Sequence, residues 1–189
     1  MAVVPTACWG ALITYDIGMN TAPLVGHTAG PFSIEFQLND GSGTNDGNNS
    51  ALLSNFTFGG GSVVVAPTLT GGATGNAATS ISLTDSSFFN QFIQEFTPGS
   101  KLGFRLALTT NLDIGGAPDQ FTLAILDSSG TELPTRSSSN VFLQIDIDSA
   151  NPLIQTFATD TSRMPAAGGN AIQYRGSDRR TRRSDRAGV

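Results

Sequence analysis

The segment from Asp40 to Asn49, DGSGTNDGNN, concentrates side chains that could bind a metal ion. Every second position offers an oxygen atom. Calcium takes six to eight oxygen ligands, and loops rich in Asp, Asn and Gly supply them. We therefore predict a calcium site, the one cofactor that this sequence indicates, with the ligands Asp40, Ser42, Thr44, Asp46 and Asn48.

The same segment also fits a solvated turn between two strands. Gly, Asn and Asp tolerate positive φ angles and favour turns whether or not a metal is bound. The EF-hand pattern is not met, because Asn45 occupies its glycine position and no Glu closes the loop. The sequence leaves both interpretations open.

Residues for other chemistry are sparse. Nucleophilic catalysis needs a base beside the nucleophile, yet His27 is the single histidine and Cys8 the single cysteine. We expect His27 to be an ordinary loop residue. A zinc site needs several His or Cys ligands, so His27 and Cys8 cannot form one. No glycine-rich phosphate loop links a strand to a helix.

Glycoside hydrolysis requires only a pair of carboxylates. The chain offers several candidates, but their spacing selects no pair: Glu35, Glu95, Asp119, Asp146 and Asp148. We therefore predict no catalytic residues and no enzymatic activity.

The composition is typical of a β-rich extracellular domain. Only 13% of the residues are charged, and the chain has 22 Gly and 12 Phe. Residues 175–189 hold six of the ten basic residues and two of the fifteen acidic ones, so the rest of the chain has a net charge of −9. Such a body repels nucleic acid, which we exclude as a partner, and we expect the Arg-rich tail to be solvated.

Apolar residues that alternate with polar ones predict short strands throughout the chain. No apolar run approaches the roughly 18 residues of a membrane span. The predicted strands cover residues 12–17, 32–38, 51–58, 63–65, 81–83, 91–97, 102–108, 121–125, 141–147 and 153–157.

Two segments carry weaker signals. Around Phe88, Phe89 and Phe92 a helical stripe competes with the strand period, and we predict a helical turn at 86–90 that leads into the strand at 91–97. Residues 67–80 are rich in Gly, Thr and Ala, so we predict a long surface loop there.

About nine or ten short strands, Gly-rich turns and no long helix predict an all-β protein, an antiparallel β-sandwich of jelly-roll-like topology. We expect this domain to span residues 11–160. Residues 1–10 are interpreted as a degraded leader or N-terminal extension, and residues 161–189 as a disordered Arg-rich tail.

Three blocks of the chain resemble the PEP-CTERM, or exosortase-sorted, extracellular proteins of bacteria, within an uncharacterised group of that family. They are FSIEFQLNDGSGTNDGNNSALLSNFTFGGGS, LTDSSFFNQFIQEFTPGSKLGFRLALTTN and PDQFTLAILDSSGTELPT. The resemblance covers about Thr14 to Asp160. It implies a secreted Gram-negative protein that is made with a signal peptide, sorted through a C-terminal anchor and associated with exopolysaccharide and biofilm. It implies no catalytic residues.

The chain departs from this family pattern at both ends. The first residues, MAVVPTACWG, lack a basic region, so we expect no intact signal peptide. The segment Met164 to Ala167 leads into the Arg-rich tail without a Pro-Glu-Pro motif or an apolar span. We therefore expect the sorting anchor not to be intact in this chain.

Three functions follow as hypotheses. The first is a non-catalytic secreted or cell-surface protein of the biofilm matrix, with extracellular polysaccharide as its partner. The second is a calcium-dependent carbohydrate-binding module, although the aromatic residues that stack on sugars are few: Trp9, Tyr15 and Tyr174. The third is a glycoside hydrolase.

Overall fold

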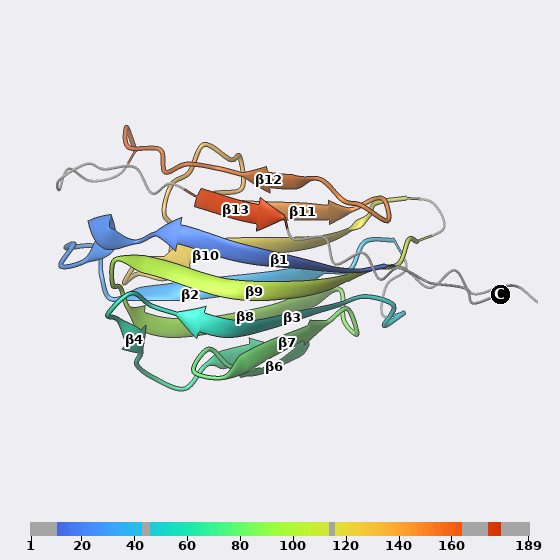
Figure 1. Cartoon of the computed structure of the whole chain (residues 1–189), viewed down its shortest axis with the longest axis horizontal. Helices are drawn as coiled ribbons and strands as arrows, with labels where there is room; N and C mark the ends of the chain where they lie inside the picture. The colour runs from blue at the N-terminus through green and yellow to red at the C-terminus, as the bar shows by residue number, and fades with distance from the viewer. Residues whose placement is uncertain (1–10, 43–45, 114–115, 164–173, 179–189) are drawn as a thin grey trace, which may run out of the picture.

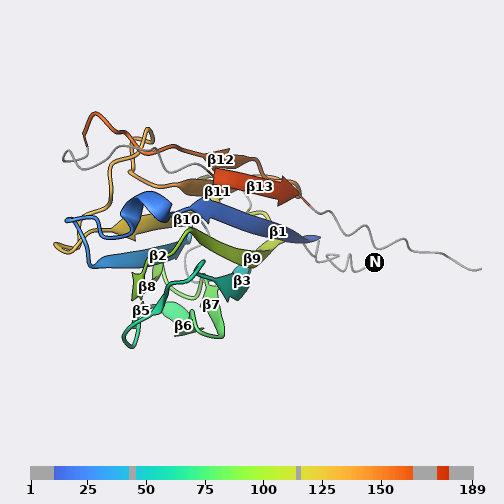
Figure 2. The same ribbon diagram turned by 60° about the vertical axis from the view of Figure 1, so that its left-hand side comes forward.

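The computed structural model describes residues 11–42, 46–113, 116–163 and 174–178 of the chain. Its strands form two antiparallel sheets that pack face to face (Figures 1 and 2). This arrangement confirms the predicted all-β sandwich. The described residues contain thirteen strands, more than the nine or ten predicted, because short edge strands extend both sheets.

The first sheet has the strand order β13-β1-β9-β3-β7-β6. Strand β9 is central and pairs along its length with β1 on one side and with β3 on the other. The bounds are β1 Ala11–Asn20, β3 Ser50–Thr57, β6 Gly72–Asn76, β7 Ser80–Thr84, β9 Lys101–Thr110 and β13 Tyr174–Asp178.

The second sheet has the order β12-β11-β10-β2-β8-β4, and β5 also pairs with β8. Its central strand β2 lies between β10 and β8. The bounds are β2 Phe32–Asn39, β4 Ser62–Val63, β5 Thr68–Thr70, β8 Phe89–Thr97, β10 Asp119–Leu126, β11 Leu143–Ile147 and β12 Ile154–Thr156.

Connections repeatedly cross from one sheet to the other. The chain passes from β1 to β2 and β3, and later from β7 through β8 and β9 to β10, alternating between the sheets (Figure 1). Strands that follow one another in the chain thus often lie in opposite sheets of the sandwich. A short 3-10 helix, η1 (Ala22–Leu24), follows β1. Among the described residues no helix has the length and apolar character needed to cross a membrane.

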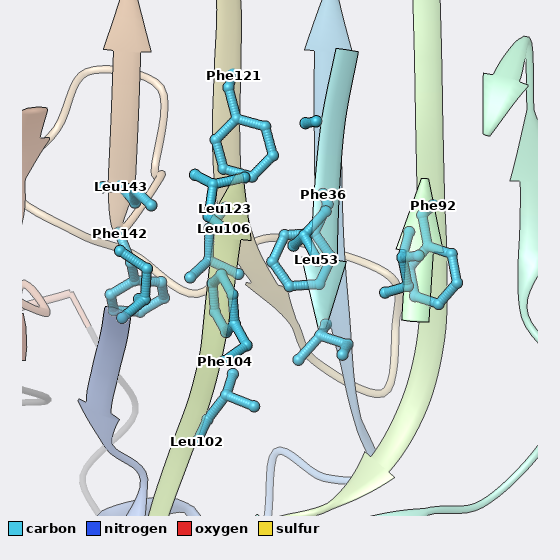
Figure 3. Packing of buried hydrophobic residues seen from close by; sticks show 14 of the residues in the cluster. Phe36, Leu53, Phe92, Leu102, Phe104, Leu106, Phe121, Leu123, Phe142 and Leu143 are labelled. Atoms are coloured by element: carbon cyan, nitrogen blue, oxygen red, sulfur yellow. The ribbon is translucent and has the colours of Figure 1, made fainter. Parts of the chain in front are cut away.

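The core lies between the sheets and follows from the period-two patterns. Phe36 of β2 is fully buried at its centre. Its ring lies edge-on to Phe104 of β9, with the ring centres 5.2 Å apart, and 6.2 Å from the rings of Phe92 and Phe121. Figure 3 shows these rings, which join β2, β8 and β10 of one sheet to β9 of the other.

The predicted helical turn at 86–90 is wrong, because β8 already begins at Phe89. The helical stripe would have buried Phe88, which instead is 64% exposed. The strand turns polar Asn90 and Gln94 inward, and backbone groups satisfy both. The Asn90 amide donates to the Leu38 carbonyl at 2.9 Å, and the Gln94 amide donates to the Val65 carbonyl at 2.6 Å.

The predicted surface loop at 67–80 is also wrong. It contains β5, which pairs with β8, and β6, which pairs with β7. All three residues of β5 are exposed and β6 has one buried side chain, Ala73, so neither strand shows an alternating apolar pattern. Backbone pairing at a sheet edge leaves no such signal.

The first and last described strands can be compared with the predicted domain bounds, residues 11–160. Strand β1 begins at Ala11. Beyond Asp160, Tyr174–Asp178 pairs antiparallel with β1, within a segment predicted to be disordered. Residues 1–10, and residues 164–173 and 179–189 of the predicted tail, lie outside the described residues.

The central role of Phe36 can be tested by its replacement with Ala. We expect Phe36→Ala to lower the free energy of unfolding by about 3–5 kcal/mol, because it removes a fully buried ring and leaves a cavity. Phe88→Ala, which truncates an exposed ring, should change it by less than about 0.5 kcal/mol. Urea denaturation followed by fluorescence measures both, and equal losses would contradict this account of the core.

Candidate metal centre

Four aspartates gather where strands of the two sheets end, and we call them the acidic loop cluster: Asp40, Asp85, Asp113 and Asp119. Asp40 directly follows β2, and Asp85 directly follows β7. Asp119 begins β10, while Asp113 lies in the connection between β9 and β10. Because Asn39 pairs with Gln120 in antiparallel register, the next positions, Asp40 and Asp119, face each other at the sheet end.

Three of these carboxylates converge. One oxygen from each of Asp40, Asp113 and Asp119 lies within 4.8 Å of the other two. Asp40 and Asp119 are each only 2% exposed. Ionised carboxylates at this separation repel each other by roughly 3–4 kcal/mol per pair at an effective dielectric constant of about 20. Their grouping therefore favours a cation between them.

Backbone and amide donors hold Asp119 in place. Its Oδ1 accepts a hydrogen bond from the Gly41 N–H at 2.7 Å, and its Oδ2 accepts one from the Asn49 side-chain amide at 2.7 Å. Gly41 allows this approach, because a Cβ there would lie 2.1 Å from the Ala117 carbonyl oxygen. Each carboxylate oxygen keeps a second lone pair that a metal could use.

Asn49 ties the surrounding loops together. Its side-chain oxygen accepts a hydrogen bond from the Asn111 N–H at 2.9 Å, and its amide also donates to the Asn111 carbonyl at 2.9 Å. Its backbone N–H donates to Asp85 Oδ2 at 2.7 Å. One buried asparagine thus fixes the chain after β9, the start of β10 and the end of β7 around the cluster.

Asp85 is the most buried member of the cluster, with 0% exposure. Burial raises the pKa of its carboxyl from 3.8 to about 7. The Asn49 N–H opposes this shift, whereas the negative charges of Asp119 and Asp46 increase it. Its Oδ1 is buried and has no hydrogen-bond partner. A side-chain hydrogen bond with Asp119 raises this pKa further, so the shift reflects both burial and the density of carboxylates around Asp85.

Among the described residues, no basic side chain forms an ion pair with Asp85 or Asp119. The ion pairs found there join Arg105 to Asp16 and Arg163 to Asp160. An all-oxygen donor set of carboxylates and amides suits a hard cation such as calcium, whose bonds to oxygen measure about 2.3–2.6 Å. Any two ligands of one calcium ion therefore lie no more than about 5 Å apart, and the three carboxylate oxygens, all within 4.8 Å of one another, meet this limit.

The structure describes four of the five predicted calcium ligands. Asp40 lies in the cluster, whereas the Ser42 hydroxyl donates to the Ala117 carbonyl at 2.9 Å. The Asn48 amide joins Asp46 and Asp113, donating at 2.8 and 2.7 Å. Thr44 lies outside the described residues.

The ligand prediction leaves out Asp85, Asp113 and Asp119. The sequence marks Asp119 only as one carboxylate of a hypothetical hydrolase, and nothing singles out the other two. A usable signal was their position, because Asp40, Asp85 and Asp119 each stand at the boundary of a strand. Knowing that these boundaries meet requires the strand order, which the sequence pattern does not supply.

Comparisons with protein-family models, with curated proteins and with solved structures return no match for this chain. The functional conclusion therefore rests on the geometry of the described residues.

The raised pKa of Asp85 predicts a pH dependence of stability. With calcium removed by a chelator, the contribution of Asp85 to the free energy of unfolding should be complete below about pH 4. It should be lost as the pH rises to about 7. The unfolded chain releases this proton near its usual pKa of 3.8, whereas the folded chain holds it up to about 7. Asp85→Asn stays neutral, so its free energy of unfolding should fall less over this range.

Urea denaturation at half-unit pH steps measures the difference between the two proteins. Equal slopes for wild type and Asp85→Asn would show that Asp85 does not titrate in this window.

Proposed function

We propose that this protein is a non-catalytic β-sandwich module of the bacterial cell surface or extracellular matrix, and that a calcium ion binds at its acidic loop cluster. The observation that carries the proposal is the convergence of Asp40, Asp113 and Asp119 within 4.8 Å, next to buried Asp85.

The calcium ion would connect segments that the backbone leaves apart. Asp40 comes from the end of β2, Asp113 from the connection after β9, and Asp119 from the start of β10. A shared ion binds these segments only in the folded state, so its binding free energy adds to the stability of the fold. The ion thus acts as a structural clamp.

The extracellular setting is consistent with such a clamp. Calcium sites of extracellular modules have a Kd of about 10⁻⁴–10⁻³ M. The scarcity of charged residues, 13% of the chain, and the blocks that resemble exosortase-sorted proteins support the same location. The aspartate carboxylates of the site, with asparagine side chains beside them, supply oxygen ligands without a cysteine or histidine.

The hydrogen bonding of the cluster supports a non-catalytic role. Both Asp119 oxygens accept hydrogen bonds from the protein, and the side chain is 2% exposed. A general acid or base of a hydrolase must instead reach a substrate. A structural metal site uses buried, fixed carboxylates of this kind.

Calcium should raise the melting temperature of the metal-free protein. At a concentration 100 times the Kd, one site adds about 2.7 kcal/mol to the free energy of unfolding, which corresponds to a shift of about 5–10 °C for a domain of this size. Asp119→Asn should abolish most of this shift, because it removes a carboxylate from the centre of the cluster. Differential scanning calorimetry with and without calcium measures it.

Asp127→Asn is the matched control. Asp127 follows the opposite end of β10, is half-buried and accepts hydrogen bonds from Ser129 and Thr131. This variant should keep the full calcium-dependent shift even if its stability without calcium changes. A wild-type protein that shows no shift at 10 mM calcium, or a shift that Asp119→Asn retains, would refute the clamp.

A further inference from the structure

The outer face of the second sheet carries an unbroken row of polar side chains. The register places six residues opposite one another on neighbouring strands β5, β8, β2, β10, β11 and β12. Their chain neighbours on β8, β2, β10 and β11 point into the core. The row consists of Thr70, Gln91, Gln37, Thr122, Gln144 and Gln155.

A second, shorter row runs beside it through Asn39, Gln120 and Asp146. Glu35 lies on the same face, two residues before Gln37 on β2. We call the two rows together with Glu35 the amide face.

Two carboxylates orient the amides of this face. Glu35 Oε1 accepts hydrogen bonds from the side-chain amides of Gln37, at 2.6 Å, and of Gln91. Asp146 accepts from Gln120 at 2.7 Å and from Gln144 at 3.0 Å. Each amide thus points its N–H group at a carboxylate and turns its carbonyl oxygen elsewhere.

Acceptors therefore outnumber donors on the amide face. Within the described part of the chain, no hydrogen bond reaches the amide oxygens of Gln91, Gln120 or Gln144. The Gln37 oxygen already accepts a hydrogen bond from the Asn39 amide at 3.3 Å, and Glu35 Oε2 and Asn39 Oδ1 are buried, so these three atoms are not counted as acceptors for a ligand. A surface of this kind is complementary to a ligand rich in O–H donors.

The charge of the face narrows the ligand class. The six strands that carry the main row contain no Lys and no Arg, whereas β8, β2 and β11 contribute Glu95, Glu35 and Asp146. A polyanion would be repelled. Hydroxyl groups can donate to the amide oxygens without introducing charge, so a neutral polyhydroxylated ligand fits best.

The extent of the row indicates a polymer. Five spacings of about 4.8 Å separate its first and last strands, which gives a length of roughly 24 Å. An exposed aromatic ring, Phe89, stands opposite Asn39 at the edge of the face and is 38% exposed. Such a ring offers apolar surface to the C–H side of a sugar ring.

We propose that the amide face binds a neutral polysaccharide chain laid across the strands, whose hydroxyl groups donate hydrogen bonds to the glutamine oxygens. The inference rests on the proposed non-catalytic matrix role and names the partner of that role. It does not require the calcium clamp, because none of its residues belongs to the acidic loop cluster.

Affinity electrophoresis of the full chain tests this proposal. Native gels should contain one of three neutral probes: dextran, a soluble β-glucan or a galactomannan. Parallel gels should contain polygalacturonate as a polyanion and chitosan as a polycation. We expect at least one neutral polymer to retard the protein. The double variant Gln91→Ala/Gln144→Ala should weaken that retardation at least ten-fold, because it removes two of the amide oxygens that accept no hydrogen bond within the described residues.

The matched control is Thr14→Ala/Ser82→Ala, which alters polar residues on the outer face of the first sheet. It should leave the retardation within about two-fold of wild type. Calorimetric melting temperatures of both double variants, compared with wild type, show whether each remains folded. If Gln91→Ala/Gln144→Ala does not fold, Gln91→Met/Gln144→Met replaces it, because Met keeps the approximate size of the side chain and removes the amide oxygen.

Gels run with calcium and with a chelator separate this proposal from the clamp. Retardation that persists in the chelator and is lost only in the glutamine variant supports the amide face. Three results would overturn it: no retardation by any neutral polymer, retention by a charged polymer alone, or equal weakening in both double variants. Shortening of the polymer during the run would contradict the non-catalytic role, whereas a missing calcium shift would contradict only the clamp.

Discussion

Burial of one face of each central strand is the constraint on which the rest of this structure depends. The ring of Phe36 contacts those of Phe92, Phe104 and Phe121, so the centres of the two sheets pack directly against each other. A slip of one residue in any central strand would turn its buried set to solvent. The packing therefore fixes the register, and the register fixes which polar residues meet on the outer face and at the strand ends.

The polar features are consequences of that register. Asp40 and Asp119 come together because β2 and β10 are paired neighbours whose ends coincide. The amides of Gln37, Gln91 and Gln144 form a row because their strands present the same phase of the alternation. In both places carboxylates lie close to donors that satisfy only part of their hydrogen-bonding capacity. The acidic loop cluster gathers carboxylates, whereas the amide face presents mainly amide oxygens, so the two sites favour different ligands.

Period-two patterns were sufficient to predict the fold class and most strands. They work where one face is apolar, as in Phe32–Asn39 and Lys101–Thr110. They fail at the edges, because Thr68–Thr70 and Gly72–Asn76 are held by backbone pairing and have little apolar side-chain burial. They also misjudge the start of β8, where inward Asn90 and Gln94 break the apolar alternation and are satisfied by tertiary contacts that no local pattern contains.

The candidate site was less accessible from the sequence. The composition of the segment from Asp40 to Asn49 indicates oxygen ligands, and Asp40 does lie among converging carboxylates. Alternate-residue spacing, however, assumes that one loop supplies all ligands. The cluster instead draws Asp85, Asp113 and Asp119 from distant segments. Glu35 shows the same limit, since its outward position predicts a solvated charge, yet Gln37 and Gln91 cover it and it is almost fully buried.

A crystal structure of the protein grown with calcium, with anomalous data, tests the central claim most directly. The account predicts one calcium ion bonded to Asp40, Asp113 and Asp119 at about 2.3–2.6 Å. It would be contradicted by carboxylates that converge without an ion at 10 mM calcium, or by an ion bound only at other residues.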